Sequence, residues 1–442
     1  MQFLGVFQFL LAFYILFYEY KRGSLSIFLW GPLLMMFGIP HMITSFVSER
    51  EFPDWVINYA SLFAIVSEAL YLFTMLVLNQ KNGRFDLVKS LRLTRNSRIE
   101  GVQLGWTFMF FMALSPYLIM THISRVAGSV MDSSWGQLLG SATDMYDMSF
   151  SVSYFYNFTS YFISFSCCMI LIFMFQKRMI LFCLTSLTVI AEVIAIREKQ
   201  RILPLVIPVF IYIYIRNRKL TLKSALRYLI VVSVGFAAVM VLAIMRDGSL
   251  QYFLSHNNPS IIAAKMADML INSKGELGLR RYFYTFIERH NHFKGFNSGA
   301  TYKRLLLMFL PTRWSFGLKP GDFAVTMANA LLGVEQTRAS AHPTFFGDSY
   351  ANFNVFGVFT GALWAVIAHF LEKMIVRRKN YYVRCGMAMS ICNMYIMVAR
   401  GSVYNSVYRY VFSCIFLYVV YHVVGAFFGR KRIRLSFSTA QG

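Results

Sequence analysis

The polar residues His342, Asp348 and Asn352 occupy the segment "ASAHPTFFGDSYANF" at 339–353, where a hydrophilic stretch gives way to an apolar one. The imidazole of His342 has an ordinary pKa of about 6.5, so it can exchange a proton at neutral pH. Asp348 and Asn352 follow at the start of the apolar run, where a carboxylate is costly unless it is paired or solvated. Alternatively, Asp348 or Ser349 caps a helix that begins there. The segment predicts an acid–base site, a helix cap, or both.

A second polar motif, "IREKQRILP" at 196–204, separates two apolar runs. It carries Arg197, Lys199 and Arg201 together with Glu198. A guanidinium matches phosphate oxygens with two parallel hydrogen bonds, so Arg197 and Arg201 are candidate ligands of a diphosphate. Cations elsewhere that are candidates for the same anion are Arg246, Arg280, Arg281, Arg313 and Arg400.

The composition indicates which kind of fold positions these residues. The chain has 442 residues, of which 57% are hydrophobic and only 14% charged, against about a quarter charged in soluble domains. Apolar stretches near twenty residues long recur and predict an all-α, polytopic membrane protein with about eleven transmembrane helices (range 10–12). We expect them at roughly 2–18, 24–47, 55–79, 103–122, 149–175, 178–196, 202–216, 226–245, 349–371, 385–399 and 409–428.

The net charge of +23 alternates between the connections. One set holds more than half of the 43 Lys and Arg residues, and the positive-inside rule assigns it to the cytoplasm. Its members are Lys21/Arg22, 81–98, Lys177/Arg178, 216–227, 373–384 and 430–434. The N-terminus then lies outside and the C-terminus inside. The turn 197–201 also falls outside, where short loops are usually poor in cations. A miscounted helix would explain that turn, but moving it inside would also invert the basic 216–227 loop.

The predicted organisation has four parts: transmembrane helices 1–8 over 1–245, a large outer loop over 246–348, helices 9–11 over 349–428, and a basic cytoplasmic tail over 429–442. The outer loop is itself basic.

Two segments of that loop, 279–289 and 300–311, are predicted as short amphipathic helices. In the first, an apolar face opposes a polar face made of Arg280, Arg281, Glu288 and Arg289. Such helices lie at the membrane interface or pack on the transmembrane bundle, and the sequence leaves both open. Either way they hold cations at the outer headgroup level.

Other ionisable residues inside apolar spans have two interpretations. Glu192 and Glu68 are functional candidates, but Glu192 can also pair with a nearby Arg, and Glu68 can be a hydrogen-bonded core residue. His41, His122, His369 and His422 lie singly on apolar faces and are interpreted as core or interface residues.

No P-loop, GxGxxG, HExxH or Asp-x-Asp motif is present, and the six cysteines show no disulfide framework or metal-ligand spacing. We therefore expect no cofactor and no metal. An enzyme built this way would act outside the cytoplasm on a preactivated substrate.

The stretch "HPTFFGDSYANF" at 342–353 resembles a pattern of the Wzy-type O-antigen and capsule repeat-unit polymerases. The matching residues are His342, Pro343, Gly347, Tyr350, Asn352 and Phe353. Asp348 stands where the family usually has Glu, and Asn354 where it usually has Gly. The segment at 393–412 is similar to the enterobacterial common antigen polymerase, and the segment at 298–314 also resembles the family.

The resemblance implies a glycosyltransferase of the bacterial inner membrane, with a periplasmic N-terminus and loop and a cytoplasmic C-terminus. It would move a chain from undecaprenyl diphosphate onto the acceptor hydroxyl of an incoming lipid-linked repeat unit. In that reading His342 or Asp348 acts on the acceptor hydroxyl, while Arg201, with Arg197 and the other candidate cations, stabilises the leaving diphosphate.

The expected partners are the lipid-linked oligosaccharide, membrane lipid, and a chain-length regulator and flippase of the same pathway; nucleic acid is not expected. Two alternatives stay open from the sequence. One is an O-antigen ligase, which uses the same donor. The other is a transporter of polysaccharide or lipid-linked sugar, although no internal repeat is evident.

Overall fold

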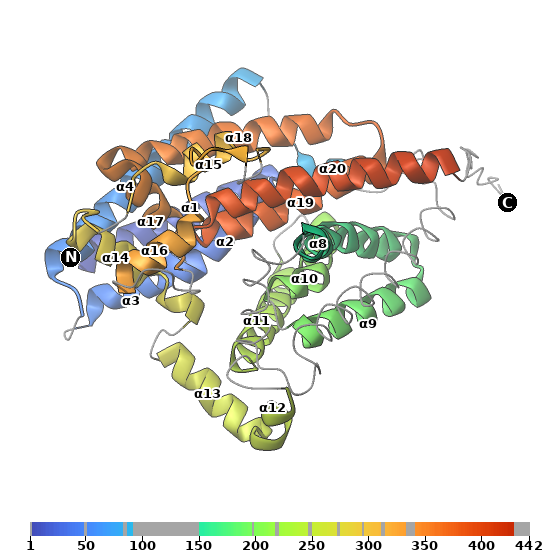
Figure 1. Ribbon diagram of the computed structural model, residues 1–442, viewed down its shortest axis with the longest axis horizontal. Helices are drawn as coiled ribbons and strands as arrows, with labels where there is room; N and C mark the ends of the chain where they lie inside the picture. Colours follow the sequence, from blue (N-terminus) through green and yellow to red (C-terminus); the bar gives the residue numbers. More distant parts are fainter. Residues whose placement is uncertain are drawn as a thin grey trace. The chain divides into compact units, whose positions relative to one another are not determined.

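The computed structural model is helical, and it contains no strand in the part of the chain that it describes (Figure 1). That part comprises residues 2–47, 51–82, 86–91, 150–196, 199–216, 221–245, 250–271, 275–293, 296–310, 314–332 and 341–427. The predicted all-α fold is therefore confirmed.

Within these residues, 7 helical segments are long and apolar enough to cross a membrane. They are Gln2–Arg22, Ile27–Phe46, Asp54–Gln80, Ala225–Ile244, Thr344–Val376, Tyr381–Ala399 and Val403–His422, and two shorter apolar segments are Tyr161–Gln176 and Met179–Ile194. Apolar segments become helical in lipid because a helix satisfies its own backbone hydrogen bonds. The chain is thus a multi-pass membrane protein.

Helices occupy every predicted span that falls in the described residues; the span expected at 103–122 lies outside them. The spans are built from α1 (Gln2–Arg22), α2 (Ile27–Leu33), η1 (Leu34–Gly38), α3 (Ile39–Phe46), α4 (Asp54–Asn82), α8 (Phe150–Gln176), α9 (Met179–Ile196), α10 (Leu203–Arg216), α11 (Leu222–Ile244), α17 (Thr344–Phe353), η5 (Asn354–Phe359), α18 (Thr360–Val376), α19 (Tyr381–Ala399) and α20 (Val403–Phe427). The connections contain α5 (Leu87–Ser90), η2 (Lys199–Ile202), α12 (Leu250–His256), α13 (Pro259–Ile271), η3 (Gly275–Gly278), α14 (Arg280–Glu288), α15 (Ala300–Leu306) and α16 (Phe323–Leu332).

Two predicted spans are interrupted. Between α2 and α3 the chain forms a π-helix, η1, in a stretch flanked by Pro32 and Pro40. Proline removes a backbone donor and disturbs the regular helix. The span expected at 349–371 begins earlier, with α17, and passes through the 3₁₀ turn η5 into α18. Asn354 lies at that break with φ +51°.

The chain divides into two compact units. The first comprises Met1–Leu87, Ala264–Met374 and Ile391–Val411. In it α1 packs on α3 and α4, and α14 packs on α4 and α17 (Figure 1). Ring contacts join the last three helices, because Phe283 of α14 lies 5.5 Å from Phe63 of α4 and 6.0 Å from Tyr350 of α17. Tilted and edge-on pairs of this kind stabilise beyond the area they bury.

The second unit comprises Val88–Ala263, Ile375–Ser390 and Phe412–Gly442. Here α8 packs on α9 and α10, and α10 packs on α11. The start of α19 is tied to the end of α5, since the Tyr381 hydroxyl donates to the Leu91 carbonyl at 2.9 Å and Arg384 Nη1 donates to the Ser90 carbonyl at 2.9 Å.

The two amphipathic segments of the outer loop differ in their surroundings. In α14 the side chains of Phe283, Tyr284, Phe286 and Ile287 are at most 1% exposed, so this helix is packed on the bundle. The segment that follows α15, in contrast, carries large apolar side chains that are mostly exposed. Of the alternatives left open by the sequence, packing on the bundle is thus confirmed for 279–289, while a position at the membrane interface stays a prediction for 300–311.

Candidate functional site

The N-terminus of α17 meets the turn between α19 and α20. The Thr344 N–H donates to the Arg400 carbonyl at 3.0 Å. A Cβ on Gly401 would lie 2.5 Å from the Thr344 carbonyl oxygen, and Gly401 has φ +90°, so only glycine fits this approach without strain. His342, which is buried, lies two residues before Thr344. The backbone therefore brings His342 beside the turn that carries Arg400.

The Asp348 carboxyl group is fully buried and joins three helices. Its Oδ1 accepts from Asn352 Nδ2 at 2.6 Å and from the Thr301 hydroxyl at 3.5 Å. Its Oδ2 accepts from the Val403 N–H at 3.2 Å. Asn352 in turn accepts from the Thr301 N–H at 3.2 Å. Since Thr301 is in the first turn of α15 and Val403 begins α20, the carboxyl group clamps α15 and α20 to α17.

The prediction that Asp348 or Ser349 caps a helix is wrong. The helix begins at Thr344 after Pro343, and no side chain caps it. Asp348 and Ser349 lie inside the helix, where the Ser349 hydroxyl donates to the Phe345 carbonyl at 2.8 Å. Polar residues usually mark the end of a membrane helix, so the predicted start of this helix was too late in the chain. Here their hydrogen bonds are made within α17 and with neighbouring helices, so the helix continues through them.

Two cations lie beside this clamp. The Arg304 guanidinium stacks 4.5 Å from the centre of the Tyr404 ring, and its Nη1 donates to the Pro320 carbonyl at 2.5 Å. Lys319 Nζ donates to the Leu310 carbonyl at 2.8 Å. Burial, and then the positive charge of Arg304, lower the pKa of Lys319. Neither cation forms an ion pair with a carboxylate in the described part of the chain.

We call the residues Thr301, Arg304, Lys319, Asp348, Asn352, Val403 and Tyr404 the α15–α17–α20 junction. Of the site residues predicted from sequence, the structure places Asp348 and Asn352 in this junction and His342 and Arg400 next to it. Arg304, Lys319 and Thr301 were missed as site residues. The only signal for Arg304 was its place at the head of an amphipathic segment, where a charge usually faces water.

Arg280 and Arg281 have different environments. The prediction that Arg280 lies on the polar face of its helix is wrong, because its side chain is buried, with Nε donating to the Thr44 hydroxyl at 3.1 Å and Nη1 to the Leu277 carbonyl at 2.5 Å. It shares a face with Tyr284, one turn later. Burial lowers the pKa of Arg280. Arg281 is exposed and forms an ion pair with Glu51 at 2.9 Å.

The second unit contains Arg201, which is only 1% exposed. Its Nη1 lies 3.9 Å from Glu192 Oε2, so the alternative that Glu192 pairs with a nearby Arg is confirmed. The buried pair with Glu192 gives Arg201 a structural role. The role of Arg201 as a diphosphate ligand stays a prediction. Predicted site residues Arg197, Arg246 and Arg313 lie outside the described residues.

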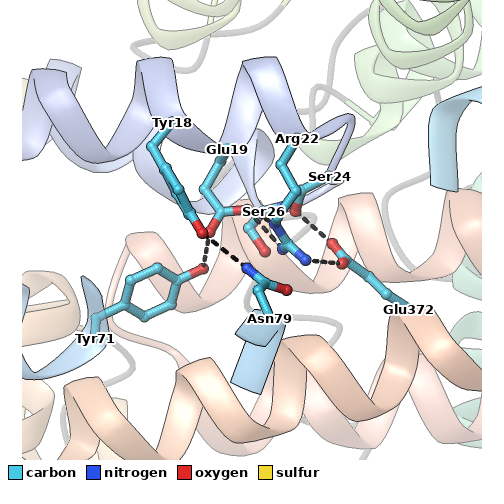
Figure 2. A network of polar contacts seen from close by, with 8 residues as sticks. All are labelled: Tyr18, Glu19, Arg22, Ser24, Ser26, Tyr71, Asn79 and Glu372. Atoms are coloured by element: carbon cyan, nitrogen blue, oxygen red, sulfur yellow. Dashed lines mark hydrogen bonds and ion pairs between the residues drawn. The ribbon is translucent and has the colours of Figure 1, made fainter. Parts of the chain in front are cut away.

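A further buried polar network belongs to the first unit and involves the ends of α1, α4 and α18 (Figure 2). Arg22 Nη2 contacts Glu19 Oε2 at 2.7 Å, and Arg22 Nη1 contacts Glu372 Oε2 at 2.8 Å. The Tyr71 hydroxyl donates to Glu19 Oε1 at 3.2 Å, and the Ser24 hydroxyl donates to Glu372. The sequence places Arg22 in a basic connection after the first span, whereas in the structure it ends α1 and is only 6% exposed. The network ties three helices together.

Two interpretations of isolated polar residues are confirmed. His41 is a core residue whose Nδ1 and Nε2 contact the Tyr284 hydroxyl at 2.5 Å and the Ser61 hydroxyl at 2.8 Å. Glu68 is fully buried and accepts from Gln8 Nε2 at 2.6 Å. No group of three or more His, Cys, Asp or Glu side chains in the described residues could hold a metal ion.

The junction and its neighbours combine an imidazole, a hydrogen-bonded carboxyl group and two cations without carboxylate partners among the described residues. Such a set can bind an anion and exchange a proton with a neighbouring hydroxyl. No protein-family model, no curated protein and no solved structure matches this chain.

Proposed function

We propose that this chain is a glycosyltransferase that joins undecaprenyl-diphosphate-linked oligosaccharide repeat units into O-antigen or capsular polysaccharide. The observation that carries the proposal is the pair Arg304 and Lys319, which lack carboxylate partners in the described residues. Arg304 stacks on Tyr404 at the start of α20, and Lys319 lies near enough to Arg304 to feel its charge. The start of a membrane span is the level at which lipid headgroups lie. A lipid-linked diphosphate is an anion that reaches this level.

The cations suit a leaving diphosphate. Arg304 is held in place by the Tyr404 ring and the Pro320 carbonyl, while its buried Nε has no hydrogen-bond partner among the described residues. A preorganised donor of this kind stabilises negative charge without reorganising as that charge develops. Arg304 and Lys319 would thus stabilise the polyprenyl diphosphate as it departs.

His342 is the proposed base. The acceptor hydroxyl oxygen would attack the anomeric carbon at the reducing end of the growing chain, and its proton would pass to the imidazole. The bond from that carbon to the diphosphate oxygen breaks, and undecaprenyl diphosphate leaves. Asp348, whose oxygens already accept three hydrogen bonds, would position α17 and thereby His342. The direct catalytic role of Asp348 predicted from the sequence stays a prediction.

Two backbone features support the resemblance to Wzy-type polymerases. A Cβ on Gly347 would lie 2.6 Å from Pro343 Cβ and 3.0 Å from Phe283 Cβ, so the glycine of the family pattern is needed for α17 to approach α14. Asn354, which stands where the family usually has Gly, has φ +51° and ψ −135°. Glycine adopts that conformation most readily.

The charge pattern supports the proposed orientation, in which the junction lies on the periplasmic face of the bacterial inner membrane. A topology reporter fused at position 199 is expected to read periplasmic, and one fused at 220 cytoplasmic. Reversed readings would overturn the orientation and, with it, the periplasmic reaction.

The decisive experiment is extension of a purified undecaprenyl-diphosphate repeat unit by the purified full chain. We expect His342→Gln to lower the rate by about 100-fold or more, the usual contribution of a general base. Arg304→Gln is expected to lower it by roughly 100-fold, the effect of losing one donor to a developing anion. The matched controls are His292→Gln and Lys303→Gln, which alter an exposed histidine and an exposed cation. Equal rates in test and control variants would refute the site.

The same assay separates the alternatives. A polymerase produces chains of several repeat units, whereas a ligase transfers a chain only to a lipid A core acceptor. A transporter moves the lipid-linked sugar across vesicles without lengthening it. Deletion in cells gives a further distinction, since loss of a polymerase leaves single repeat units on the core and loss of a ligase leaves none.

A further inference from the structure

Five large apolar side chains between Leu306, the last residue of α15, and Leu318 face outward. Leu306 and Phe316 are 86% and 93% exposed, more than any other large hydrophobic side chain in the described residues. Phe309, Trp314 and Leu318 are 65%, 69% and 58% exposed. None of the five lies in a candidate membrane span. We call these five residues the apolar wedge.

The backbone turns Phe316 outward. Phe316 has φ +47° and Gly317 has φ +77°, so two consecutive residues adopt the left-handed conformation. This conformation is unfavourable for a bulky residue such as Phe316. Because Phe316 is 93% exposed, its ring gains little packing against the described chain in return. An unfavourable turn that exposes an aromatic ring points to a partner outside the chain.

Both ends of the wedge are fastened to the membrane helices α17 and α20. Before it, Thr301 bonds with Asn352 of α17, and Arg304 stacks on Tyr404 of α20. After it, Arg304 holds the Pro320 carbonyl. Next along the chain, Asp322 Oδ2 accepts from Asn405 Nδ2 of α20 at 3.3 Å. The wedge is therefore held at the start of α20, and the bond from the Thr344 N–H to the Arg400 carbonyl joins the start of α17 to the turn before α20. The ends of two spans lie at the level of the membrane surface.

The charge around the wedge complements an anionic lipid surface. Between positions 300 and 321 the chain has no Asp or Glu, while Lys303, Arg304 and Lys319 flank the apolar side chains. Cations beside exposed Trp, Phe and Leu are typical of segments that bind at the headgroup level of a bilayer. A protein partner would not require the wedge to lie at the end of two spans.

We infer that the apolar wedge inserts into the lipid leaflet that meets the N-terminal ends of α17 and α20, with the flanking cations at anionic headgroups. Insertion would hold the α15–α17–α20 junction at a set depth in the membrane. The inference goes beyond the proposed function and depends neither on catalytic activity nor on which face of the membrane is involved.

The test uses the full chain in nanodiscs of phosphatidylcholine and phosphatidylglycerol. Trp314 fluorescence is taken as the difference between the native chain and Trp314→Phe. We expect lipids brominated high in the acyl chain to quench this signal at least about twofold more than lipids brominated near the chain end, because a wedge of this kind enters only the headgroup and upper acyl region. Water-soluble acrylamide should quench it weakly.

Phe316→Asp removes the most exposed member of the wedge and disturbs little packing. In this variant we expect bromolipid to quench Trp314 less and acrylamide to quench it more. Trp30 lies in the core and is only 1% exposed, so its fluorescence should not change. Strong acrylamide quenching in the native chain would show a wedge in water and overturn the inference. Protection of Trp314 from both quenchers would show a protein cover, such as a second copy, and would overturn it as well.

Discussion

Replacement of Asp348 tests whether its carboxyl group is a clamp or a catalytic group. The side chain is fully buried. In Asp348→Ala the Val403 N–H loses its acceptor at 3.2 Å, and an unsatisfied buried donor costs about 1–3 kcal/mol. Asn352 Nδ2 loses its bond of 2.6 Å to the carboxylate but keeps one of 2.8 Å to the Asp348 carbonyl, so that loss adds only about 1 kcal/mol.

We therefore expect Asp348→Ala to lower the free energy of unfolding by roughly 2–4 kcal/mol. Asp348→Asn has nearly the same shape and retains one oxygen for the Val403 N–H, while its amide can donate to the Thr301 hydroxyl. The new NH2 group then faces the Asn352 NH2 group, so the 2.6 Å bond between these side chains is lost. The expected loss of stability is about 1–2 kcal/mol. The measurement is equilibrium unfolding of the full chain in mixed detergent micelles, with the exposed Glu288→Ala as control.

Extension of the lipid-linked substrate by the same variants separates the two roles. A positioning role predicts that Asp348→Asn retains most of the activity as well as most of the stability. Native stability in Asp348→Ala would refute the clamp. A stable Asp348→Asn variant without activity would instead identify the carboxylate as the base and refute our assignment of that role to His342.

Three further variants probe the positions that hold the fold. Gly347→Ala should destabilise by about 1–3 kcal/mol because the new methyl group overlaps Pro343 and Phe283, whereas Gly321→Ala, with its nearest atom at 3.5 Å, should not; equal unfolding midpoints would contradict this. Arg22→Met should cost about 3–5 kcal/mol because it leaves two buried carboxylates without their cation, and the exposed Lys21→Met serves as control in the same unfolding assay. Arg201→Met should likewise destabilise by stranding its carboxylate partner, and removing that carboxylate in addition should restore part of the stability; a double variant as unstable as the single one would argue against the pair.

The positions of the helices could be predicted because lipid leaves an apolar segment few alternatives. A span must satisfy its backbone internally, so hydropathy alone located a helix at every predicted span within the described residues. The core roles of His41 and Glu68 could be predicted for a related reason, since a lone polar group on an apolar face needs a partner inside the protein.

The start of α17 could not be predicted from hydropathy. Asp348 and Asn352 look like the polar end of a span, and only their bonds to Thr301 and Val403 make them interior residues. Arg280 was misplaced for a similar reason, because periodicity assigns a charge to the solvent face unless acceptors such as Thr44 are known to lie nearby. The partners Thr44, Thr301 and Val403 are far away in sequence from the residues they bond, and no local pattern reveals them.

The sequence by itself determined the class of the protein, its spans, and the residue types that could bind a diphosphate and move a proton. These properties follow from hydropathy and side-chain chemistry, which are local. Only the tertiary structure decided which cations are neutralised and which are not. Arg22 and Arg281 each meet a carboxylate from a distant segment, while Arg304 rests on an aromatic ring. That difference arises from pairings between residues distant in the chain, so it exists only once the helices have packed.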